Sequence, residues 1–317
     1  MITVIAGGVG SARFLAGLVQ VVDPASLTVV VNTGDDESVR GLHVSPDIDT
    51  VLYHLAGLSD WDRGWGICEE TFVCDQRYRD LASKLPDCGT DLQEWFSLGD
   101  RDLATNLLRA RLLDSGMTLT QATDGLRRAM SIGCRVLPMS DDPVRTVFTT
   151  AAGEALDFQE YFVRRGASDE IAAVTFKGAD RAAPAPGVLE AVADCEVLIF
   201  PPSNPLISTA PPLAVPGMRE AVAAARARRV GVSPIVGGRA LKGPADRLLA
   251  SLGHEVSPAG VARIYAGLLD VFVVDERDAG AAPGVEAAGM RAVLCDTVMR
   301  SAEDAARLAK TVLEVAA

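Results

Sequence analysis

The chain has 317 residues, 49% of them hydrophobic, and a formal net charge of -12. This length allows one large core or a core with an appendage, and the negative charge disfavours nucleic acid and anionic membrane surfaces as partners. The three histidines lack metal-ligand spacing, which disfavours zinc, so a bound metal would be held by carboxylates, the ligands that suit Mg²⁺. The six cysteines include no C-x-x-C pair, and the apolar surroundings of Cys195 and Cys295 favour buried free thiols.

The N-terminus and the apolar runs predict a cytoplasmic protein. Met1 leads directly into a short strand, without a basic n-region or a cleavage site. No apolar run approaches the ~18 residues of a membrane span.

Short runs rich in Val and Ile alternate with segments of helical period. Residues 2–6 and 27–32 predict the first two strands, with a helix at 11–21 between them. Further strands are predicted at 196–200, 229–232, 271–274 and 292–295, and helices at 218–228 and 245–252. Continuous apolar strands between amphipathic helices indicate an α/β fold with a Rossmann-like, mostly parallel sheet and helices on both faces.

The middle of the chain has a different pattern. Residues 60–131 predict a helical segment, with Thr118 and Thr120 as candidate caps and Gly116 as a stop. Residues 135–180 predict a small strand-rich insertion, with strands at 145–150, 158–163 and 171–176. We therefore expect a single domain over residues 1–317, whose core comprises about 1–60 and 185–317.

A glycine turn, Gly7-Gly8-Val9-Gly10, lies between the first strand and the first helix. Backbone amides at such a helix start attract phosphate oxygens, and Arg13 would add a positive charge. The turn matches neither G-x-G-x-x-G nor a P-loop. A plain glycine turn is the alternative.

Two acidic motifs follow. Asp35 and Asp36 come after the second strand, where paired carboxylates suit Mg²⁺ or a general base; an ordinary acidic loop is the alternative. Asp47 and Asp49 lie at the start of a helix that Ser45 is predicted to cap, and acids there also stabilise a helix without any function.

Polar motifs also occur further along the chain. Asp100-Arg101-Asp102 opens a helix whose apolar face is predicted to be Leu103, Leu107 and Leu108, and Arg101 would either bind phosphate or form a surface ion pair. Ser203 and Asn204 follow the strand at 196–200 and would either bind a nucleotide or form a turn. Lys242 follows small residues after the strand at 229–232.

Taken together, these motifs resemble the 2-phospho-L-lactate transferases of coenzyme F-420 biosynthesis, called CofD in archaea and FbiA in actinobacteria. The matching segments, in family order, are A-G-G-V-G at 6–10, V-N-T-G-D-D at 31–36, S-P-D-I-D-T at 45–50, R-G-W-G-I at 63–67, L-G-D-R-D at 98–102, residues 137–143, P-S-N-P at 202–205, S-P-I at 233–235 and D-E-R-D at 275–278. The resemblance covers nearly the full length.

The resemblance implies a reaction. The ribityl hydroxyl of FO (7,8-didemethyl-8-hydroxy-5-deazariboflavin) attacks the β-phosphorus of a guanosine diphospho-linked donor and releases GMP. The donor carries lactate in archaea and enolpyruvate in many bacteria. Mg²⁺ and a homodimer are also implied.

The resemblance also implies site roles. Asp49 would contact FO and act as a candidate base, with Asp47 and Arg101 as further substrate-binding residues. Asp35, Asp36 and Asp49 would hold the metal. The nucleotide-binding residues would be Gly8, Gly10, Asn32, Thr33, Ser203 and Asn204. On this basis Asp49→Asn should fold normally and lose transfer to FO.

One position departs from the family pattern, and two rival functions remain. Ser97 stands where archaeal relatives have a lysine before L-G-D-R-D, which puts a second FO contact in doubt. A non-catalytic nucleotide-binding regulator, similar to the gluconeogenesis factors, would share the glycine turn but ignore FO. An NAD-dependent oxidoreductase is disfavoured by the absent G-x-G-x-x-G.

Overall fold

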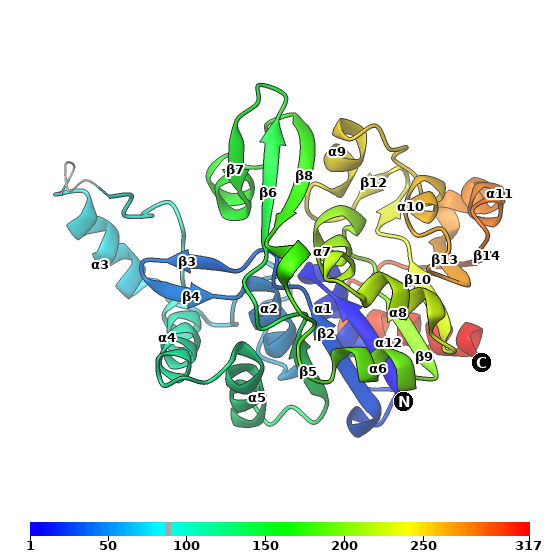
Figure 1. The fold of residues 1–317 in the computed structure, drawn as a ribbon, viewed down its shortest axis with the longest axis horizontal. Coiled ribbons are helices and arrows are strands. Elements are labelled where there is room, and N and C mark those ends of the chain that lie inside the picture. The colour runs from blue at the N-terminus through cyan, green and yellow to red at the C-terminus, as the bar shows by residue number, and fades with distance from the viewer. Residues whose placement is uncertain (86–89) are drawn as a thin grey trace.

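The computed structural model describes residues 1–85 and 90–317, and Cys88 and part of the predicted helical segment lie outside them. A seven-stranded parallel sheet forms the centre, in the order β14-β13-β10-β9-β1-β2-β5 (Figure 1). Its strands are β1 (Ile2–Ala6), β2 (Leu27–Val31), β5 (Arg135–Pro138), β9 (Val197–Phe200), β10 (Arg228–Val232), β13 (Val271–Asp275) and β14 (Arg291–Cys295).

The central strands are buried because helices cover both faces of the sheet. Every residue of β2 is buried, as in β13, which explains why both strands are apolar apart from Thr28 and Asp275. One face packs against α1 (Gly8–Leu18), α2 (Pro46–Leu55), α5 (Leu119–Ala129) and α12 (Ala302–Ala316). The other packs against α6 (Val188–Asp194), α7 (Ala210–Ala214), α8 (Met218–Ala224), α10 (Pro258–Ile264) and α11 (Ala282–Ala287). The predicted Rossmann-like α/β class is confirmed.

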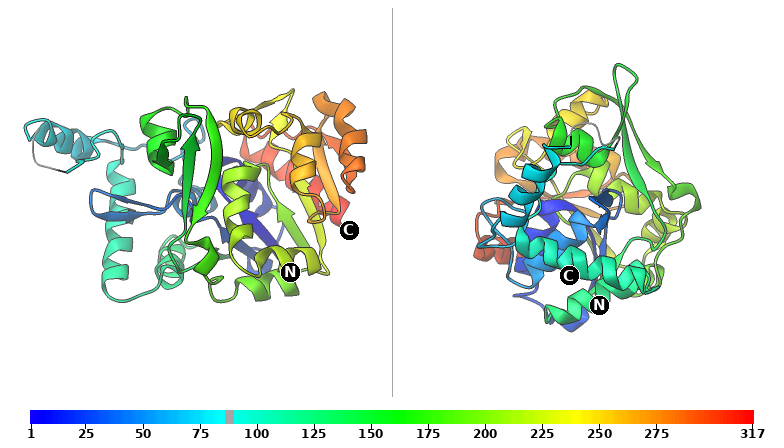
Figure 2. Two further views of the ribbon diagram at one scale, coloured as in Figure 1. Left: turned by 45° about the horizontal axis from the view of Figure 1, so that its top comes forward. Right: turned by 90° about the vertical axis from the view of Figure 1, so that its left-hand side faces the viewer.

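Additional elements surround one end of the sheet. The hairpin of β3 (Glu37–Val39) and β4 (Leu42–Val44) lies beside α4 (Asp100–Asp114), and α3 (Val73–Ala82) projects furthest from the sheet (Figures 1 and 2). A three-stranded antiparallel sheet, β7-β6-β8, stands out from the body. It comprises β6 (Arg145–Thr150), β7 (Ala155–Asp157) and β8 (Ile171–Lys177).

The remaining short elements connect these layers. They are β11 (Ile235–Val236), β12 (Arg239–Ala240), α9 (Ala245–Ser251), the single turns Pro24–Ser26, Ala179–Arg181 and Glu276–Ala281, and the π-helical turns Glu160–Arg164 and Pro205–Thr209. None of the helices in the described part of the chain combines the length and apolar character that crossing a membrane requires.

Some local predictions about strands and caps were wrong. Residues 158–163, predicted as a strand, enter the turn Glu160–Arg164, and the rings of Phe158 and Phe162 stack at 5.4 Å, the i, i+4 contact that a helical turn allows. Residues 135–138, assigned to the insertion, form β5 of the main sheet beside β2. Thr120 lies inside α5, whose cap is Thr118.

Candidate active site

A cavity of about 600 Å³ lies at the carboxyl ends of β1 and β9. Gly7 and Gly8, which follow β1, and Pro202 and Ser203, which follow β9, contribute to its wall. The chain leaves β1 toward β2 on one side and places β9 on the other, so the strand order reverses there. Ligands of open α/β sheets bind at such a switch point.

The glycine turn brings α1 close to the loop after β9. Gly8 has φ of 71°, in the left-handed region, and its amide donates to Asp47 Oδ1 at 2.7 Å. A Cβ atom at Gly10 would lie 2.0 Å from the carbonyl oxygen of Pro202. Both glycines line the cavity, and the acceptor already at the start of α1 is a side-chain oxygen of Asp47.

Asn32 holds two of the predicted carboxylates together. Its Nδ2 donates to Asp47 Oδ2 at 2.9 Å and to Asp35 Oδ1 at 3.4 Å, and its Oδ1 accepts from the Gly34 amide. Asp35 and Asp47 line the cavity, whereas Asn32 and Thr33 are buried outside its lining. Asn32 therefore organises the acidic loop.

Burial and the charges of neighbouring carboxylates raise the pKa values of both Asp35 and Asp47. Burial is the largest cause that raises the pKa of Asp35 well above its ordinary value, followed by the charge of Asp47. Burial also raises the pKa of Asp47, to about 6, against the hydrogen bonds from Asn32 and Gly8. The pair thus lacks a compensating cation among the described residues.

Asp36 contacts other residues than the pair Asp35 and Asp47. Its Oδ2 accepts from Ser45 Oγ at 2.8 Å and lies 3.0 Å from His43 Nε2. The Ser45 hydroxyl therefore does not cap α2, although Ser45 occupies the predicted cap position. Asp36 does not line the cavity.

Asp49 lines the cavity and is paired with Arg109, a residue that the sequence analysis missed. The guanidinium donates to both carboxylate oxygens of Asp49, and Arg109 is 0% exposed. The predicted apolar face of α4 was wrong for Leu107 and Leu108, whereas Leu103 packs against a buried cluster. Leu107 and Leu108 are exposed, and the buried side chains of α4 are Thr105, Asn106 and Arg109.

The Arg109 network continues to Asp102, which also lines the cavity. Asn106 accepts from Arg109 at 2.8 Å and donates to Asp102 Oδ1, which also accepts from Tyr53 at 2.7 Å. Burial and then the charge of Asp49 raise the pKa of Asp102 to about 7.

Arg101 lies outside this network. Its guanidinium donates to the carbonyl of Cys68 at 3.0 Å, pairs with Glu69 at 3.5 Å, and does not line the cavity. Ser97, the departure from the family pattern, does line it and accepts from Arg79 at 2.6 Å.

Ser203 and Asn204 line the cavity beside the glycine turn. Asn204 Oδ1 accepts from the Leu206 amide at 2.9 Å, whereas its Nδ2 is buried and has no hydrogen-bond partner among the described residues. This amide is an available donor for a bound ligand.

Aromatic side chains form a further part of the wall. They come from three separate segments of the chain and are Tyr53, Trp65, Trp95, Phe96, Phe158 and Phe162. Flat rings of this kind suit a planar, apolar ligand.

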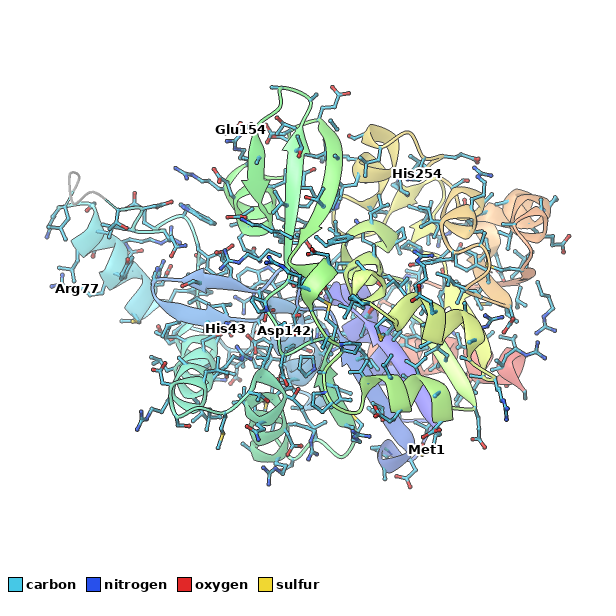
Figure 3. The ribbon with its side chains drawn as sticks, viewed as in Figure 1. Met1, His43, Arg77, Asp142, Glu154 and His254 are labelled. Carbon is cyan, nitrogen blue, oxygen red and sulfur yellow. The ribbon has the colours of Figure 1, made fainter. Side chains whose placement is uncertain are left out.

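The described residues contain no group of three or more His, Cys, Asp or Glu side chains arranged to hold a metal by themselves. Two of the histidines, His43 and His254, lie in different parts of the molecule (Figure 3). The acidic pair Asp35 and Asp47 offers two carboxylates, which is the protein share of many Mg²⁺ sites completed by water and phosphate.

Comparison with known proteins decides the family. The family model described as 2-phospho-L-lactate transferase CofD matches residues 2–313. The chain belongs to the CofD family. A phosphoenolpyruvate transferase of Streptomyces griseus is 47% identical over 99% of this chain and 98% of its own. A 2-phospho-L-lactate transferase of Methanosarcina mazei is 39% identical over 98% of this chain and 99% of its own.

The membership confirms the predicted enzyme class, a CofD-family phosphotransferase of coenzyme F-420 biosynthesis. A solved structure of a UPF0052 family member from Bacillus halodurans also superposes, with a TM-score of 0.68, 17% identity and 98% of both chains covered. At that identity the likeness concerns the fold.

Proposed function

We propose that this CofD-family chain transfers a 2-phospholactyl or enolpyruvyl phosphate group from a guanosine diphospho-linked donor to the ribityl hydroxyl of FO, with release of GMP. The relatives named phosphoenolpyruvate transferase and 2-phospho-L-lactate transferase support the transferred group. The acid itself, lactate or enolpyruvate, is left open by these two names. We further propose a homodimer in the cytoplasm.

The observation that supports this function is a single cavity with two kinds of wall. Buried carboxylates and the glycine turn lie at the switch point, and aromatic rings line the same cavity. The first wall suits a diphosphate with its cation, and the second suits a deazaflavin ring. A non-catalytic regulator would need the first wall alone.

The acidic pair fits Mg²⁺. Asn32 Nδ2 donates to both Asp35 and Asp47, and burial, with the charges of neighbouring carboxylates as smaller causes, raises their pKa values. These two residues would hold the ion, which when bound neutralises charge on the diphosphate. Asp36 and Asp49, also predicted as ligands, are engaged by His43 and Arg109.

Asp49 is assigned to binding of FO. Both of its carboxylate oxygens accept hydrogen bonds from the Arg109 guanidinium. The pairing fixes the orientation of Asp49 in the cavity wall. Ser203 and Asn204 are assigned to the nucleotide, with the free Nδ2 of Asn204 as donor.

The test is incubation of the purified chain with FO, Mg²⁺ and either the lactyl or the enolpyruvyl guanosine donor. We expect GMP and a phosphodiester of FO whose mass identifies the acid. Omission of FO is the control for donor hydrolysis. Binding of guanosine nucleotides without any FO product would instead favour the regulator.

A further inference from the structure

Two cations of the cavity wall, Arg13 and Lys242, have no role in the site described so far. Arg13 lies on α1, and Lys242 follows β12. Within residues 1–85 and 90–317, no carboxylate oxygen lies within 4.0 Å of either cation. Arg63, which lines the same cavity, differs because its Nε lies 2.8 Å from Asp60 Oδ2.

The two cations contact backbone carbonyls instead. Lys242 Nζ donates to the carbonyls of Asp62 at 3.0 Å and Arg63 at 3.1 Å. Arg13 Nη2 donates to the carbonyl of Trp61, and the guanidinium lies 5.3 Å from the centre of the indole ring. Arg13 Nε is buried and has no hydrogen-bond partner among the described residues.

Both cations converge on one glycine. Gly64 has φ of 86°, and a Cβ atom there would lie 3.0 Å from Lys242 Nζ and 3.7 Å from Arg13 Nη2. Position 64 therefore lies beside both cations.

The charge of Arg13 disfavours the charge of Lys242. Burial lowers the pKa of Arg13, against the charge of Asp62, and burial and then the charge of Arg13 lower the pKa of Lys242, against the charges of Asp62 and Asp60. Burial, with the charges of Arg13 and Lys242 as smaller causes, also lowers the pKa of His54, to about 4, so that His54 is neutral at pH 7. Like charges held together at a cavity wall are stabilised by a bound anion.

We propose that Arg13 and Lys242 form an anion subsite of the cavity, which binds a phosphate or carboxylate group through charge-assisted hydrogen bonds. The proposal rests on the proposed function only for the source of that anion, the diphosphate or the three-carbon acid of the donor. The unpartnered Nε of Arg13 is the donor that the ligand would satisfy.

A purely structural role of Arg13 and Lys242 would give a different experimental result. If the two cations only held the loop at 61–64 through its carbonyls, their removal would lower stability without changing anion affinity. Affinity for a small anion is therefore the deciding measurement.

The experiment compares the whole chain with Arg13→Gln and Lys242→Gln by calorimetry, without metal, using inorganic diphosphate and GDP as probes. Lys310→Gln on α12 is the matched control, because Lys310 is exposed and outside this cavity. Lys242→Arg, which keeps the charge, is the rescue variant. We expect each Gln variant to bind diphosphate at least about tenfold more weakly, with near-normal binding by Lys310→Gln and Lys242→Arg.

The KM for the donor identifies the source of the anion. Weaker binding of diphosphate and GDP places the donor's phosphates in the subsite. Unchanged binding of these probes with a raised donor KM places the carboxylate there. The proposal is overturned if both Gln variants match the parent chain in probe binding and in donor KM.

The diphosphate measurement also separates the two proposals. If the parent chain forms no FO product but the Gln variants still lose diphosphate binding, the proposed function fails and the subsite stands. The subsite proposal fails if the parent chain binds neither diphosphate nor GDP and its KM for the donor equals that of the Gln variants.

Discussion

Asp49 and Arg109 form a buried ion pair, with exposures of 4% and 0%. Sixty residues separate them in sequence, one on α2 and one on α4. A buried guanidinium that loses its carboxylate keeps the desolvation cost and loses the compensating attraction. The expectation that Asp49→Asn folds normally therefore has to be revised.

We predict that Asp49→Asn lowers the free energy of unfolding by about 3–5 kcal/mol, as expected for removal of one partner of a buried pair. Urea unfolding followed by circular dichroism measures it. The double variant Asp49→Leu, Arg109→Met removes both charges and should recover most of the loss. A single variant as stable as the parent chain would show that water reaches Arg109.

The cavity depends on how closely α1 approaches the loop after β9. This contact is an element-scale feature, because α1 also packs against α2 and α12 and cannot shift alone. Gly10 permits the approach, since any side chain there would overlap the carbonyl of Pro202. Packing alone therefore explains why position 10 is a glycine, without any contact to a phosphate group.

We predict that Gly10→Ala destabilises the chain by about 1–3 kcal/mol, the usual cost of forcing an extra group into a packed site. Gly125→Ala on α5 is the matched control. Its new Cβ would meet only Leu112 at an ordinary 3.6 Å, and the better helix propensity of alanine should stabilise by up to about 1 kcal/mol. Equal effects at both positions would contradict the packing argument.

At the scale of the whole molecule, the chain carries an overall charge of -12 and still gathers buried carboxylates at one cavity. Asp47 has a pKa of about 6 in the folded chain, above the ordinary value of roughly 4. Between these values the folded chain retains a proton that the unfolded chain has released. Stability from this group is therefore lost as the pH rises from about 4 to about 6.

We predict that Mg²⁺ raises the melting temperature more at pH 7.5 than at pH 5, because the ion competes with the proton for Asp47 and Asp35. Thermal unfolding with MgCl₂ or with EDTA at both pH values measures the effect. Asp47→Asn should show a smaller Mg²⁺ effect at pH 7.5 and a weaker loss of stability between pH 4 and pH 6. An unchanged Mg²⁺ effect in that variant would remove Asp47 from the metal site.

The amino-acid sequence by itself determined the parallel sheet and the order of its motifs. Runs such as residues 27–31 are apolar at every position except Thr28, and this pattern can be recognised within a single strand. The glycine turn and the polar loop after β9 were found in the same way, because strand ends and turns have local signals.

Only the tertiary structure decided which of these residues meet. The placement of α2 and α4 pairs Asp49 with Arg109, and the hairpin of β3 and β4 places His43 beside Asp36. Arg109 had no local signal, since its neighbours Leu107 and Leu108 gave α4 a misleading apolar face. Local periodicity reports which residues share a face, but partners distant in sequence depend on how the faces pack.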